Sequence, residues 1–208
     1  MDILGKVGQA YFPYLLGQKG SRRESIPSHI QKSAQFANLG YKKPEERPRK
    51  IENFGEYLPQ YSNKDVAIYK DDKTKQMNIA IRGSDFSQPV KDLVGDIALI
   101  AGKLDETPRY KDVKNTIELA KKTNPEYKTK SISHSLGAST GRYLVEEGVL
   151  DKSLGFSEGI SPFFQPQDNR NVSSIRFKSD IISYPDENKG VISYEPRRSY
   201  AHGLGGFF

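Results

Sequence analysis

Residues 127–143, YKTKSISHSLGASTGRY, contain a run typical of a β-strand, then a cluster of small and polar residues, then a stretch typical of a helix. Ser135 lies where the strand is expected to pass into the helix. A serine on such a tight turn is pushed out of the sheet, and small residues two positions away on either side keep strand and helix from colliding. Ser133 and Gly137 occupy those two positions. The pattern therefore indicates that Ser135 is a nucleophile.

The same stretch has a simpler interpretation. The usual motif is G-x-S-x-G, and Ser133 stands where that motif has its first glycine. A serine adds only a hydroxymethyl group, so the turn can accommodate it. Many chains contain S-x-S-x-G by chance, however, and a polar loop that caps a helix is the alternative at this point. The choice between a nucleophile turn and a helix-capping loop therefore depends on residues elsewhere in the chain.

Length and composition limit the kinds of protein to consider. A chain of 208 residues with 35% hydrophobic residues is long enough for one α/β domain with a substantial core, and no change in composition divides it. The chain has no cysteine, which excludes disulfides and thiolate metal sites. Its three histidines argue against a histidine-rich metal site. We therefore expect no metal and no cofactor.

Charge and the N-terminal stretch bear on partners and location. Residues 1–20 lack a basic region before their apolar residues and contain no run that would span a bilayer, so we expect neither a signal peptide nor an anchor, which favours an intracellular or viral protein. The net charge of +6 is compatible with attraction to anionic lipid or nucleic acid. The basic residues are scattered in pairs without interleaved aromatics, so no nucleic-acid partner is expected. An anionic membrane surface stays open as a partner.

The order of strand-like and helix-like patterns predicts the fold class. Alternating strands and helices predict an α/β fold whose sheet is largely parallel in its centre. We expect residues 1–60 to form an arm and a helix packed on a core at 61–208, with 41–63 as an irregular surface excursion, in a single domain overall. Helices are predicted at 28–40, 90–103, 109–123 and 136–147, a β-hairpin at 65–70 and 76–82, and further strands at 153–160, 172–184 and 191–194.

A nucleophilic serine needs a base, and the base needs an acid that holds its tautomer. His202 is the only histidine after Ser135, so it has no competitor as the base. Asp180 ends an alternating apolar run where a strand should pass into a loop, and we favour it as the acid over Asp186, which lies in a plain turn. His134 is adjacent to Ser135 in sequence and should face another way, so we expect it to be a packing residue.

Taken together, residues 60–204 resemble the class 3 lipase family of α/β hydrolases. Four stretches carry the resemblance, namely IAIRGS at 79–84, DLVGD at 92–96, SHSLG at 133–137, and FKSD at 177–180 together with AHG at 201–203. They are similar, in that order, to the family's F-R-G-[ST] strand end, its D-W-x-x-D region, its G-H-S-L-G turn, and its acid and base loops.

The resemblance implies an α/β-hydrolase fold, with a mostly parallel central sheet flanked by helices, and a set of site residues. It implies that Ser135 is the nucleophile, Asp180 the acid and His202 the base. It also implies that the backbone N–H groups of Ser84 and Leu136 form the oxyanion hole. The implied activity is hydrolysis of lipid esters, with no cofactor.

Three functions remain to be compared. The first is a serine hydrolase that cleaves carboxylic esters of lipids through an acyl-serine intermediate. The second is a catalytically weak hydrolase-fold protein that binds a membrane or a partner protein. The third, a peptidase or thioesterase, would use the same catalytic residues. A complete serine, aspartate and histidine set in the right order favours the first.

Overall fold

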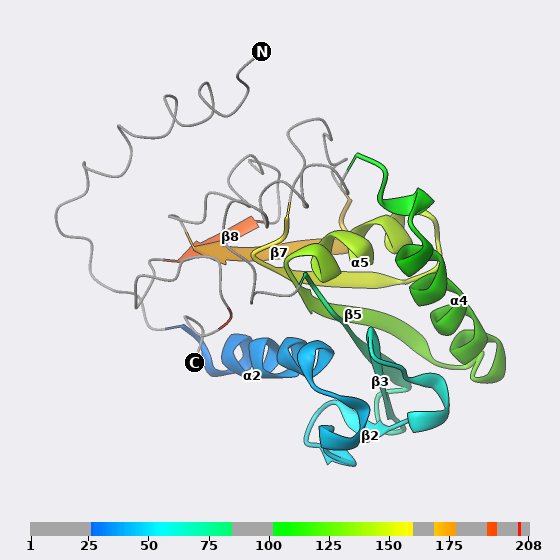
Figure 1. Cartoon of the computed structure of the whole chain (residues 1–208). Coiled ribbons are helices and arrows are strands. Elements are labelled where there is room, and N and C mark those ends of the chain that lie inside the picture. The colour runs from blue at the N-terminus through cyan, green and yellow to red at the C-terminus, as the bar shows by residue number, and fades with distance from the viewer. Residues whose placement is uncertain (1–25, 85–101, 160–168, 178–190, 195–203, 205–208) are drawn as a thin grey trace, which may run out of the picture.

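The structure is a computed structural model of the whole chain (Figure 1). It describes residues 26–84, 102–159, 169–177, 191–194 and Leu204. Asp180, Asp186 and His202 lie outside these residues, and so does the predicted helix at 90–103 apart from its last two positions.

The described strands form one sheet in which spatial order follows sequence order. The first four strands pair antiparallel, and the sheet is parallel from the fourth strand to the eighth. This confirms the expected hairpin and the largely parallel centre of the sheet. The strands are β1 (Lys50–Ile51), β2 (Gly55–Tyr57), β3 (Val66–Asp71), β4 (Gln76–Ile81), β5 (Lys128–His134), β6 (Lys152–Phe156), β7 (Val172–Phe177) and β8 (Val191–Tyr194).

The α-helices of the described residues begin and end close to the predicted positions. They are α2 (Ser28–Ala37), α4 (Pro108–Thr123) and α5 (Leu136–Glu146), and α2 continues as the 3₁₀ helix η2 (Asn38–Tyr41). Shorter 3₁₀ turns are η3 (Pro44–Glu46), η4 (Pro59–Tyr61) and η5 (Leu104–Glu106). None of these helices has the length and apolar character needed to cross a bilayer.

The excursion expected to be irregular at 41–63 contains β1 and β2, which the sequence analysis missed. These strands have two and three residues, too few to show an alternating pattern. The turn between them uses positive φ angles at Asn53 and Gly55. A side chain at Gly55 would overlap the carbonyl oxygen of Lys70 on β3, so glycine is needed where β2 joins the sheet.

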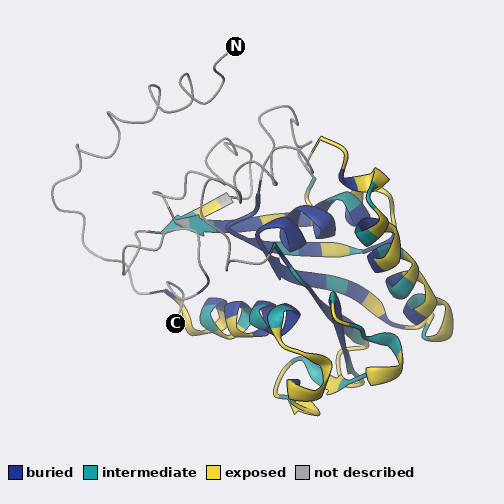
Figure 2. Ribbon diagram, in the orientation of Figure 1, coloured by how far each residue is buried: buried dark blue, intermediate teal, exposed yellow. Residues whose placement is uncertain are grey.

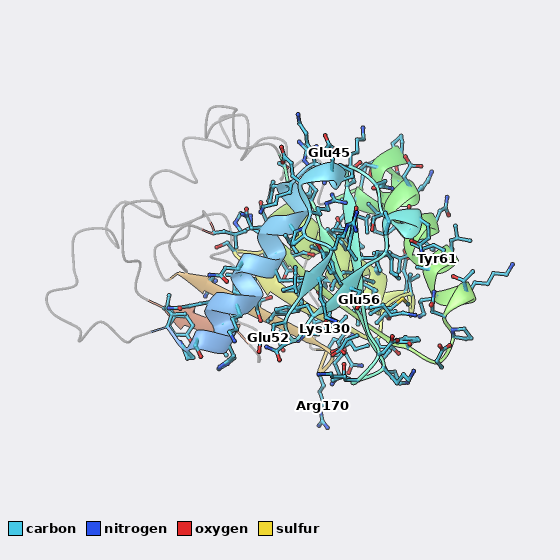
Figure 3. The ribbon with its side chains drawn as sticks, turned by 90° about the horizontal axis from the view of Figure 1, so that it is seen from below. Glu45, Glu52, Glu56, Tyr61, Lys130 and Arg170 are labelled. Carbon is cyan, nitrogen blue, oxygen red and sulfur yellow. The ribbon has the colours of Figure 1, made fainter. Side chains whose placement is uncertain are left out.

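Helices pack on both faces of the sheet. Successive side chains of a strand point to opposite faces, so a strand such as β3 contributes to an apolar cluster on either side. On β3, Val66 and Ile68 belong to the apolar cluster shared with α4 and α5, whereas Ala67 and Tyr69 belong to the cluster shared with α2. Seen from below, α2 crosses the near face of the sheet (Figure 3). The strands between the helices are mostly buried (Figure 2).

A buried ion pair ties α5 to the neighbouring strands. Arg142 on α5 donates two hydrogen bonds to the carboxylate of Glu158, at 2.6 Å and 2.9 Å, just beyond the end of β6. Ser174 on β7 donates a third to the same carboxylate, at 2.6 Å. The side chains of the pair are only 6% and 3% exposed. The turn at the start of α5 is thus held by polar contacts further along the helix.

We predict that Glu158→Gln lowers the free energy of unfolding by about 3–5 kcal/mol, because it removes the negative charge that compensates a buried guanidinium. Urea unfolding followed by circular dichroism measures this. Glu56→Gln is the matched control, since Glu56 also pairs with a cation, Lys50 at 3.0 Å, but on the surface. The control should cost less than about 1 kcal/mol. Equal losses in the two variants would contradict the assignment.

Candidate active site

The residue between β5 and α5 is Ser135, and its backbone is in an unusual conformation. Its φ of 55° and ψ of −129° lie in a region that residues other than glycine seldom adopt, at a cost of roughly 1–3 kcal/mol. Its N–H donates to the carbonyl of Phe156 at 3.0 Å, and its own carbonyl accepts from Ala138 at 2.9 Å. The sharp strand-to-helix turn predicted from the sequence is therefore present and is held from both sides.

The hydroxyl of Ser135 does not cap the helix that follows. Ser135 occupies the N-cap position of α5, yet its side chain makes no capping hydrogen bond. A serine used as a cap would accept from the N–H groups of the second or third helical residue. The geometry thus differs from the alternative of a polar loop that caps a helix. The side chain is fully buried.

Gly137 lets the start of α5 lie directly on the end of β4. A Cβ atom at this position would overlap the carbonyl oxygen of Ile81 and lie 3.0 Å from the carbonyl carbon of Arg82. The glycine of the S-x-S-x-G pattern is therefore required by close backbone contact. Further along the helix, Gly141 lies against the hydroxyls of Ser131 and Ser153 in the same way.

Ser133, where the usual motif has glycine, has a specific role in this chain. The backbone pairing of β4 with β5 runs only to Ile79 and Ser131. Beyond that point, the Ser133 hydroxyl accepts the N–H of Ile81 at 2.9 Å, and both groups are buried. The side chain thus replaces a backbone acceptor where the two strands separate, which accounts for serine in place of glycine.

The strand end at Arg82, Gly83 and Ser84 also contacts the turn. A Cβ atom at Gly83 would lie 2.8 Å from the carbonyl oxygen of His134 and would overlap the hydroxyl of Tyr41. The structure therefore brings together the two segments that carry Ser84 and Leu136, the predicted oxyanion-hole residues.

His134 is buried and hydrogen-bonds through Nδ1 with the Tyr41 hydroxyl at 2.9 Å. It points toward η2, as expected for a packing residue. Tyr41 was missed by the sequence analysis, because a contact across 93 residues leaves no local pattern. Arg109, which contacts the same strand end, was missed as well. Its one signal is a positive charge in the first turn of a helix, where cations are unfavourable.

A second serine has similar backbone geometry at the end of the adjacent strand. Ser157 follows β6 with a φ of 45°, is fully buried, and has no hydrogen-bond partner for its hydroxyl within the described residues. In the described stretch that follows, up to Gly159, no helix begins. Within this described stretch, Ser157 therefore lacks the aligned N–H groups that a helix start supplies beside Ser135.

The predicted acid and base, Asp180 or Asp186 and His202, lie outside the described residues. β7 ends at Phe177, three positions before Asp180. Because β5, β6 and β7 are parallel, the chain leaves β7 at the same edge of the sheet as Ser135. The roles of these residues stay predictions.

The residues that the structure describes contain no group of three or more histidine, aspartate or glutamate side chains able to hold a metal ion.

We predict that Gly137→Ala destabilises the protein by about 1–3 kcal/mol or more, because overlap with the Ile81 carbonyl forces the backbones apart. A Gly→Ala change inside a helix would otherwise stabilise by roughly 0.5–1 kcal/mol. Thermal unfolding measures the sign. Gly102→Ala is the control, since a Cβ there meets no atom within 4 Å. A Gly137→Ala protein as stable as this control would contradict the close contact.

Comparison with known proteins gives structural matches only. No family model matches the sequence, and neither does any curated protein. The Lip2 lipase of Yarrowia lipolytica superposes with a TM-score of 0.50 at 15% identity, over 84% of this chain and 82% of that chain. Its nonglycosylated form gives a TM-score of 0.51 at the same identity and coverage. The protein thus has the α/β-hydrolase fold of fungal lipases, with a mostly parallel sheet flanked by helices.

Proposed function

We propose that the protein is a serine hydrolase that cleaves carboxylic esters of lipids through an acyl-serine intermediate. The observation that carries the proposal is the strained turn at Ser135, whose hydroxyl does not cap α5. The neighbours of Ser135 in the chain, His134 and Gly137, lie against the strand end before Ser84. A nucleophile at a strand-to-helix turn, beside backbone N–H donors from a second strand end, is the arrangement that acyl transfer requires.

In the proposed reaction the Ser135 hydroxyl oxygen attacks the ester carbonyl carbon while His202 accepts its proton. The oxyanion that forms accepts hydrogen bonds from the N–H groups of Ser84 and Leu136. The intermediate then collapses, and the leaving alcohol takes the proton from His202. Water next attacks the acyl-serine while His202 takes its proton, and His202 passes that proton to the Ser135 oxygen as the carboxylic acid leaves. Asp180 holds His202 in the tautomer that leaves the attacking nitrogen unprotonated.

Lipid esters are the proposed substrates because the two structures compared above, both of Yarrowia lipolytica Lip2, are lipases. The net charge of +6 adds a reason to expect attraction to an anionic lipid surface. Thioesters and peptides would use the same residues, so a substrate panel has to include them.

We predict that a fluorophosphonate probe labels Ser135 and that Ser135→Ala abolishes both labelling and turnover of p-nitrophenyl esters. The reason is that, among the described residues, Ser135 alone joins a strained strand-end turn to the start of a helix. Peptide mass spectrometry identifies the labelled residue. Since Ser135 is buried, labelling is measured with and without detergent micelles, which supply an apolar interface.

Ser157→Ala is the matched control for that experiment, because Ser157 is also buried with a positive φ at a strand end. The control should keep labelling and turnover. Labelling that moves to Ser157 would reassign the nucleophile. A wild-type protein that neither reacts nor hydrolyses any ester or thioester, yet binds vesicles, would favour a binding module instead.

For the acid, we predict that Asp180→Asn lowers kcat by several orders of magnitude while the thermal midpoint stays nearly unchanged. Loss of the acid leaves the imidazole in the wrong tautomer, and in chymotrypsin-type serine proteases the corresponding change costs about 10⁴ in kcat. Asp186→Asn should cost less than about tenfold. Steady-state kinetics on both variants decides, and a reversed result would make Asp186 the acid.

A further inference from the structure

The segment that follows β4 and carries Ser84 accepts hydrogen bonds from an arginine on α4. The guanidinium of Arg109 donates from Nη2 to the carbonyl oxygen of Arg82 and, at 3.2 Å, to that of Gly83. Arg109 lies in the first turn of α4. Thr107 fixes where that helix begins, because its hydroxyl accepts the N–H of Tyr110 at 3.2 Å. One side chain thus contacts two successive peptide groups just before Ser84.

Asp65 contacts both Arg109 and the strand end that Arg109 binds. Its carboxylate lies 3.4 Å from Nε of Arg109, and its backbone carbonyl accepts the N–H of Arg82 at 2.9 Å. The Asp65 side chain is only 14% exposed. Burial lowers the pKa of the Arg109 guanidinium, and the negative charge of Asp65 opposes this shift. Asp65 therefore supports both the arginine and the segment that the arginine holds.

The position of Arg109 is not favourable for the helix itself. The N-terminus of a helix carries a partial positive charge, so a cation in the first turn costs roughly 0.3–1 kcal/mol at an exposed site. The first turn of α4 contains no acidic residue that would offset this charge. The contacts with Arg82 and Gly83 give a reason for an arginine at this place that helix stability does not.

Peptide geometry links these contacts to the proposed oxyanion hole. In a planar trans peptide, the C=O of one residue and the N–H of the next point in opposite directions. No cis peptide is present in the described residues. A hydrogen bond to the Gly83 carbonyl therefore fixes the direction of the Ser84 N–H, which points away from Arg109.

We propose that Arg109, held by Asp65, is a positioning residue that fixes the Ser84 N–H as an oxyanion-hole donor. The inference rests on the proposed function. Donors that are already oriented when charge develops on the substrate need no reorganisation, and loss of one such donor lowers kcat by about 10²–10³. Arg109 does not touch the reacting atoms in this account. Its loss should weaken transition-state stabilisation and leave ground-state binding nearly unchanged.

The test compares Arg109→Met, Arg109→Lys and wild type on a p-nitrophenyl ester. Arg109→Met should lower kcat about 10- to 100-fold with KM changed less than about threefold, since a misplacement of about 1 Å can cost 10² in rate. Arg109→Lys should recover part of kcat, because an ammonium can donate to these carbonyls but lacks the planar fork whose Nε faces Asp65 while Nη2 faces the carbonyls. The Ki of a boronic acid that forms a tetrahedral adduct should rise by the factor that kcat/KM falls.

Lys114→Met is the matched control. Lys114 lies on the same helix, has the same 34% exposure as Arg109, and pairs with Glu147 at 3.0 Å, away from the strand end. It should leave kcat and the boronic acid Ki unchanged. An active wild type with normal kcat in Arg109→Met would overturn the inference alone. A wild type without turnover or labelling of Ser135 would overturn the proposed function, and the inference with it.

Discussion

The structure of the site depends on one close contact, where the backbone of Gly137 lies on the last peptide of β4. This contact requires that no side chain separate the start of α5 from Ile81. β5 ends at His134 and α5 begins at Leu136, so the chain turns within a single residue between them. That residue is Ser135, and its φ is positive. The strained turn and the close contact thus occur together at the start of α5.

A strained residue persists only where its surroundings determine its conformation more strongly than the strain opposes it. Several polar contacts around Ser135 help to meet this condition. Ser133 binds the N–H of Ile81, the Arg142 pair with Glu158 holds α5, and Tyr41 fills the space beside Gly83. Most of these groups are buried, where an unmade hydrogen bond costs about 1–3 kcal/mol. Movement of the turn would therefore break several costly contacts together.

Local patterns predicted most of the regular elements that the structure describes, and they could not predict the contacts between those elements. The helix at 109–123 was recognisable because its apolar residues repeat with helical spacing, and the structure places α4 within one residue of it. The turn at Ser135 was recognisable because its constraints lie within five residues. Arg109, in contrast, contacts a carbonyl 27 positions earlier. No sequence period connects such a pair, and the two short strands before β3 are too brief to have one.

The presence of serine at position 135 has an energetic cost, which is relevant to the proposed function. Glycine adopts a positive φ without steric penalty, whereas a residue with a Cβ atom at the φ and ψ of Ser135 costs roughly 1–3 kcal/mol. A hydroxyl can compensate for this by capping the helix, and the Ser135 hydroxyl does not. A nucleophile needs its oxygen held in place, and under the proposed function the strained turn holds the Ser135 oxygen beside the N–H groups at the start of α5.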